Sequence, residues 1–103
     1  MRVDAIDPAE SVVLTFDFSP ALDAGETLTG TITTLVSMAL GSDATPHNVL
    51  NGTPAFGVGN TSVLVGVKGG LVDRDYAIKV VVGTSNPAKV LALVAHLPIR
   101  EEA

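Results

Sequence analysis

The sequence predicts an all-β domain, built as an antiparallel β-sandwich of about seven strands. Val, Ile and Thr supply 29 of the 103 residues, and β-branched side chains suit a pleated, half-buried sheet better than a helix. Apolar and polar residues alternate with a period of two over several stretches, which is typical of strands with one buried face. Turn residues separate these stretches at intervals of about 8–12 residues, as in sandwiches and small barrels.

The first two expected strands span residues 11–18 and 27–36. In the first, the inward face carries Val12, Leu14, Phe16 and Phe18. Pro20 and the turn residues 23–26 then end it, since Gly accepts a positive φ and Asp bonds its own backbone. In the second, Thr residues alternate with Leu28, Gly30, Ile32 and Val36. A glycine within a strand predicts a β-bulge or a close approach by another backbone.

The middle of the chain predicts a short strand and a hairpin. Residues 48–50 can form a short strand before the Asn51-Gly52 turn. Residues 54–58 and 61–67 should pair as a hairpin that turns near Gly59-Asn60. Its second strand places three valines on one face, Val63, Val65 and Val67.

Two longer strands complete the expected fold. Residues 75–82 place Tyr76, Ile78, Val80 and Val82 inward. Ser85-Asn86-Pro87 turns the chain, and residues 89–97 run back as the last strand. Residues 87–97 could instead form a helix, because Ala, Leu and Lys are good helix formers and Asn86-Pro87 resembles a cap followed by proline at the first helical position.

Tyr76 and Gly70 are the residues expected to carry a structural role. Tyr76 follows the Gly70-Leu71-Val72-Asp73-Arg74-Asp75 stretch and enters an alternating strand. In immunoglobulin-like sandwiches, a tyrosine near the start of the penultimate strand bonds back to an upstream main-chain group and fixes the corner between sheets. The alternative is a buried tyrosine with another hydrogen-bond partner. The sequence thus favours an immunoglobulin-like or fibronectin-like sandwich.

Three segments are expected along the chain: an N-terminal extension (1–10), the sandwich domain (11–100) and a C-terminal tail (101–103). The extension is short and polar, with Val3 and Ile6 as its large aliphatic residues and Pro8 before the first strand. We expect it to be loosely held in the isolated domain and to order on assembly by adding to a neighbour's sheet edge. Val3, Ile6 and Pro8 are therefore the candidate interface residues.

Charge and composition limit the possible partners. The net charge of −5 and the pI near 4.6 oppose binding to a phosphate backbone, so nucleic acid is not an expected partner. No cysteine is present, so neither a disulfide nor a thiolate metal site can form. The opening residues lack the apolar core of a signal peptide, and no apolar stretch approaches about 20 residues. We expect a soluble chain that is neither exported nor membrane-bound.

No motif in the sequence predicts an enzyme, a cofactor or a metal ion. His47 and His96 lack a second ligand at a suitable spacing. The glycines at 57–59 precede no helix or phosphate-binding lysine and indicate a hairpin turn. A cluster of acidic residues could surround calcium, but its spacing matches no calcium loop and predicts solvated surface acids. These residues are Asp4, Asp7, Glu10, Asp73 and Asp75.

The order of these features resembles tailed-bacteriophage virion proteins with an immunoglobulin-like sandwich, of the fibre–tail adaptor or head-decoration type. The resemblance covers most of the chain. The stretches that carry it are residues 7–10, 14–18, 25–28, 67–76, 82–85 and 97–99, which read DPAE, LTFDF, GETL, VKGGLVDRDY, VGTS and LPI.

This resemblance implies a non-catalytic structural protein, made in the host cytoplasm and present in several copies in the virion. Its expected partners are other virion proteins of the tail, connector, fibre or capsid. An adaptor that links fibres to the tail or connector is the first expectation. The alternatives are a capsid decoration protein and a carbohydrate- or surface-binding β-sandwich module.

Overall fold

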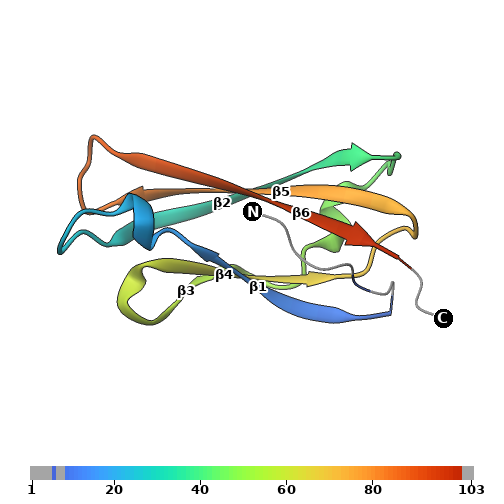
Figure 1. Cartoon of the computed structure of the whole chain (residues 1–103), viewed down its shortest axis with the longest axis horizontal. Helices are drawn as coiled ribbons and strands as arrows, with labels where there is room; N and C mark the ends of the chain where they lie inside the picture. The colour runs from blue at the N-terminus through green and yellow to red at the C-terminus, as the bar shows by residue number, and fades with distance from the viewer. Residues whose placement is uncertain (1–5, 7–8, 101–103) are drawn as a thin grey trace.

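The computed structural model describes Ile6 and residues 9–100, and its fold is all-β (Figure 1). Two three-stranded antiparallel sheets, in the orders β1-β4-β3 and β2-β5-β6, form two layers. The strands are β1 (Ser11–Asp17), β2 (Leu28–Leu40), β3 (Ala55–Phe56), β4 (Ser62–Lys68), β5 (Arg74–Thr84) and β6 (Val90–Ile99). Three short 3-10 helices connect them, η1 (Ser19–Ala21), η2 (Pro46–Val49) and η3 (Val58–Asn60).

The core lies between the two layers and is built from alternate residues of the strands. The inward faces predicted for β1, β4 and β5 are confirmed, since their apolar residues are buried or, at Val12, half-buried. The largest fully buried side chain is Tyr76, followed by Phe16 and Phe18. The other core residues are Ile6, Leu14, Leu28, Val36, Val49, Val63, Val65, Val67, Ile78, Val80, Val82, Ala95, Leu97 and Ile99.

The expected bulge occurs in β2, which is also longer than its alternation indicated. The register of β2 against β5 shifts between Thr29 and Thr33, and Gly30 has a φ of +84°. A Cβ at Gly30 would have open space around it, so the backbone angle rather than a close neighbour requires glycine. Beyond Val36 the strand continues to Leu40 because β5 is long enough to pair with it.

The described residues contain six strands, and the strand expected at residues 48–50 is absent. Residues 46–49 form η2 instead, and Leu50 makes only a single bridge to Val67. Pro46 explains the difference, because its restricted φ suits the first turn of a helix. The strand expected at 54–58 is reduced to β3, because the chain turns at Gly57 into η3.

Residues 90–99 form β6, so the helix considered for residues 87–97 is wrong. β6 pairs with β5 in continuous register from Val90 to Ile99. Helix propensity amounts to less than about 1 kcal/mol per residue for ordinary residues. Pairing with a neighbouring strand, together with burial of Ala95, Leu97 and Ile99, therefore outweighs it.

Ile6 belongs to the core of its own chain. Its side chain is 7% exposed and its backbone bridges Ile99 of β6 in parallel. The Ile6 N–H donates to the Pro98 carbonyl at 3.1 Å, and the Arg100 N–H donates to the Ile6 carbonyl at 2.9 Å. Ile6 is therefore not loosely held in this structure, and its expected contact with a neighbouring chain stays a prediction. Val3 and Pro8, the other two candidates, lie outside the described residues.

Candidate functional site

Three connections meet at one end of the domain, the left end in Figure 1. They are residues 18–27 between β1 and β2, residues 57–61 between β3 and β4, and residues 85–89 between β5 and β6. We call this surface the loop end. The loops of sandwich domains are common binding sites because the two sheets hold them rigidly.

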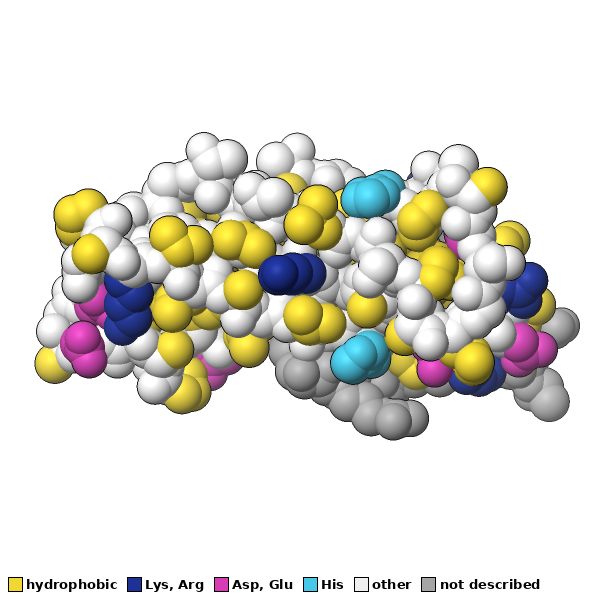
Figure 2. Space-filling view, turned by 90° about the horizontal axis from the view of Figure 1, so that it is seen from above, with side chains coloured by type: hydrophobic (Ala, Val, Ile, Leu, Met, Phe, Trp, Pro, Cys, Tyr) yellow, Lys and Arg dark blue, Asp and Glu magenta, His cyan; other side chains and the backbone are white. Residues whose placement is uncertain are grey.

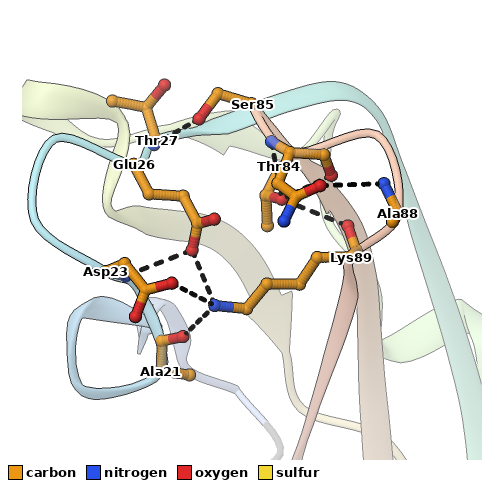
Figure 3. A network of polar contacts seen from close by, with 9 residues as sticks. Ala21, Asp23, Glu26, Thr27, Thr84, Ser85, Ala88 and Lys89 are labelled. Atoms are coloured by element: carbon orange, nitrogen blue, oxygen red, sulfur yellow. Dashed lines mark hydrogen bonds and ion pairs between the residues drawn. The ribbon is translucent and has the colours of Figure 1, made fainter.

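Lys89 joins two of these loops (Figure 3). Its Nζ donates to the Ala21 carbonyl at 2.7 Å and to Glu26 Oε1 at 2.6 Å. The same Nζ lies 3.9 Å from Asp23 Oδ2. Glu26 Oε1 also accepts the Asp23 N–H at 3.1 Å, and the Glu26 N–H donates to the Asp23 carbonyl at 3.0 Å. A single lysine thus fixes the turn at residues 21–26 from the opposite loop.

The carboxylate of this ion pair is largely buried. The Glu26 side chain is 8% exposed and the Lys89 side chain 27% exposed. The hydrogen bond from Lys89 lowers the pKa of Glu26, and the same bond raises the pKa of Lys89. Both groups are therefore charged at neutral pH, and the pair is better shielded from water than an ordinary surface ion pair.

A second set of hydrogen bonds joins the ends of β2 and β5. The Ser85 N–H donates to the Thr27 carbonyl at 2.7 Å, and the Thr27 N–H donates to Ser85 Oγ at 3.2 Å. Thr84 is buried, and its hydroxyl accepts the Asn86 N–H at 3.2 Å. The Ala88 N–H donates to Asn86 Oδ1 at 3.1 Å. These bonds fix the conformation of loop 85–89 beside loop 18–27 (Figure 3).

The third loop is a tight turn with an exposed tip. The Gly57 N–H donates to the Ser62 carbonyl at 2.9 Å and closes the turn, and the Phe18 N–H donates to the Thr61 carbonyl at 3.0 Å. That second bond links this turn to the end of β1. Val58 at the tip has a relative exposure of 101%, so its side chain projects into solvent.

Small apolar side chains make up much of the exposed surface of the loop end. At the left of Figure 2, hydrophobic side chains surround a group of acidic and basic side chains. The exposed apolar residues are Pro20, Ala21, Ala24, Val58, Pro87 and Ala88. Lys89 pairs with Glu26 and lies near the exposed Asp23, so the loop end presents small apolar patches beside these charges. Such a patch can bind another protein by shape and burial of apolar area.

Tyr76 lies at the opposite end of the sheet, and its hydroxyl bonds back to the main chain. The Leu71 N–H donates to Tyr76 Oη at 2.9 Å, and Tyr76 donates to Asp43 Oδ2 at 2.7 Å. The bond to Leu71 spans the connection between β4 and β5, which joins the two sheets. The hydroxyl thus holds this connection and the loop after β2 together.

Gly70 packs directly on Tyr76. A Cβ at position 70 would lie 2.5 Å from the Tyr76 hydroxyl oxygen and 2.8 Å from Val49 Cγ1. Neither neighbour can move away easily, because both side chains are fully buried. Close approach to the tyrosine therefore requires glycine here.

Raising the pH should ionise Tyr76 above the ordinary range of a tyrosine and lower the stability of the domain. Burial raises the pKa of Tyr76 above its ordinary value of 10.0; the bond from the Leu71 N–H opposes this shift, and the bond to Asp43 adds to it. The unfolded chain ionises first, so the stability that the neutral phenol contributes is present below pH 10.0 and is lost as pH rises through the folded pKa. Tyr76 is the chain's only tyrosine, so tyrosinate absorbance reports it alone. We expect that absorbance to rise together with loss of the β-sheet circular dichroism. Ionisation near pH 10 with the fold intact would contradict this assignment.

The two histidines considered as ligands have different surroundings in the structure. His47 Nε2 accepts the Val36 N–H at 3.3 Å, whereas His96 is exposed on β6. Asp75 pairs with Arg100 at 2.8 Å. Asp4 and Asp7 lie outside the described residues. Within Ile6 and residues 9–100, no group of three or more His, Asp or Glu side chains could hold a metal ion.

The surface formed by the described residues contains no pocket. No helix among them is long and apolar enough to cross a membrane.

The sequence did not reveal the Lys89 network. Asp23 and Glu26 are recognisable as turn residues, and Lys89 follows a turn, but Lys89 and Glu26 are 63 positions apart. The available signal was the pair of polar turns at 23–26 and 85–87. Their meeting at one end depends on how the strands are arranged in the two sheets.

Comparison of the chain with models of known families, with curated proteins and with solved structures finds no match.

Proposed function

We propose that this chain is a non-catalytic immunoglobulin-like module that binds another protein of a larger assembly through its loop end. The observation that carries the proposal is the Lys89 network, which holds loops 18–27 and 85–89 in fixed positions around exposed apolar residues. A surface ordered before binding loses less conformational entropy when a partner docks. This favours recognition by a preformed surface.

Strand order supports the immunoglobulin-like part of the proposal. In such sandwiches a four-stranded sheet of strands A, B, E and D faces a sheet of strands C, F and G, which contains the last two strands. Here β1-β4-β3 faces β2-β5-β6, and Ile6 pairs in parallel with the last strand. Tyr76 near the start of β5, the penultimate strand, bonds back to Leu71 as a corner tyrosine does.

The assembly we propose is a bacteriophage virion, in which the chain links fibres to the tail or connector. Support for this part comes from the sequence stretches that resemble fibre–tail adaptor and head-decoration proteins. A mass-spectrometric inventory of purified particles tests it directly. The proposal requires the chain at several copies per particle, and its absence from intact particles would overturn it.

Val58→Asp tests the loop end itself. The side chain projects fully into solvent, so the change should leave the melting temperature nearly unchanged. We expect incorporation into particles to fall about tenfold or more, because a charge is then desolvated in the interface. Mass spectrometry of particles assembled with the variant measures this.

Leu71→Asp is the matched control, since Leu71 is also exposed but lies in the connection at the other end of the domain. If Leu71→Asp is incorporated normally and Val58→Asp is not, the result supports binding through the loop end. If Val58→Asp is incorporated normally and Leu71→Asp is not, binding occurs at the opposite end of the domain instead.

A further inference from the structure

Within the described residues, β1 has a longer and more regular outer edge than the other outer strands. It pairs with β4 in continuous register over all seven residues. Among the residues that the structure describes, no strand pairs with its other side. Proteins commonly protect such edges with bulges, prolines or lysines, and residues 11–17 contain none of these.

The other outer strands are shortened, irregular or occupied. β3 has only two residues. β2 has two register shifts, and His47 accepts its Val36 N–H. β6 is covered at its C-terminal end by Ile6. β1 is therefore the edge best suited to extend its sheet.

The backbone groups on this edge belong to the odd-numbered residues. The Phe18 N–H donates to the Thr61 carbonyl, and the Glu10 carbonyl accepts the Gly69 N–H, so even-numbered residues face the β4 side. Backbone direction alternates along a strand. The N–H and C=O groups that point away from β4 are those of Ser11, Val13, Thr15 and Asp17.

We propose that β1 pairs with β1 of a second copy of this chain, antiparallel about a two-fold axis at Leu14. This register opposes Ser11 to Asp17 and Val13 to Thr15, and each pair can exchange both N–H···O bonds. It uses every residue of the strand and joins the two sheets β1-β4-β3 into one. The surface is distinct from the loop end, so the inference goes beyond the proposed function.

Charge supports this register. Ser11 is paired with Lys68 of β4. In the proposed register Ser11 is also paired, on its other side, with Asp17 of the second copy. Asp17 and Lys68 would then lie on the same face of the sheet with one strand between them, and their backbones would be about 10 Å apart. Ser11 is small, and the lysine side chain can reach across it to the carboxylate. A shift of register that moves the axis toward Asp17 would instead bring the two Asp17 residues together, which is unfavourable.

Val13→Pro tests the pairing by sedimentation equilibrium from about 5 µM to about 1 mM, because an interface below roughly 1,200 Å² is expected to be weak. The substitution removes an N–H that points away from β4, a position where edge strands tolerate proline. Val13→Thr keeps the N–H and is the control. We expect the parent and Val13→Thr to dimerise with rising concentration and Val13→Pro to bind at least about tenfold more weakly. A parent that stays monomeric throughout, or a Val13→Pro variant that dimerises equally well, overturns the proposal.

A charge exchange provides a test that does not depend on folding of the proline variant. Asp17→Lys and Lys68→Glu should each weaken the dimer, since each places like charges across Ser11. The double variant should restore the affinity of the parent, because it reverses the pair. Two single variants with unchanged affinity, or a double variant weaker than either, would overturn the register.

Discussion

Replacing Tyr76 with Ala is expected to lower the free energy of unfolding by about 3–5 kcal/mol, the range for loss of a large aromatic side chain from a core. Tyr76 is the largest fully buried side chain, and Gly70 packs against its ring and hydroxyl. Its removal leaves a cavity next to a tight glycine contact. Urea denaturation followed by circular dichroism measures the change.

Tyr76→Phe separates the hydroxyl from the ring. The ring remains, so the expected loss is about 1–2 kcal/mol, the cost of leaving polar partners without a hydrogen bond. Those partners are the Leu71 N–H and the Asp43 carboxylate. In an Asp43→Asn background the same substitution should cost less, since part of the interaction is already altered. If Tyr76→Phe is as stable as the parent, the Tyr76 hydroxyl does not stabilise the fold.

Ile6→Ala should lower the free energy of unfolding by about 2–3 kcal/mol, the low end for Ile truncation because the residue lies at a sheet edge. The side chain is 7% exposed and the backbone is bonded to both Pro98 and Arg100. For a domain of this size the melting temperature should fall by roughly 10 °C or more. Thermal melting of the isolated domain is the measurement.

Val58→Ala is the control for this truncation. It also shortens an aliphatic side chain, but Val58 is fully exposed, so the expected change is within about 0.5 kcal/mol. If Ile6→Ala melts like the parent while its incorporation into particles is impaired, Ile6 acts in an interface rather than in the core.

Much of the core could be read from alternation. Val63, Val65 and Val67 of β4, and the inward residues of β5, are buried as predicted, because a period of two assigns faces without knowledge of the partner strand. Pattern alone did not place Leu50, which contributes one bridge after η2. A run of two or three apolar residues is too short to separate a strand from a turn of helix.

The candidate site was harder to predict than the core. The two turns around Glu26 and Ser85 were recognisable from their composition. Their contact through Lys89 was not, because turn chemistry describes local backbone and carries no information on which turns become neighbours. Likewise, Ile6 has the same local signal whether it forms core in its own chain or binds a neighbour.

The sequence by itself determined the all-β class and the inward faces of the main strands, because alternation is a local property. Only the tertiary structure decided that Ile6 lies against β6, that residues 87–97 contain no helix, and that Lys89 reaches Glu26. These outcomes depend on contacts between residues far apart in the chain. Their free energies exceed the local preferences that a single segment expresses.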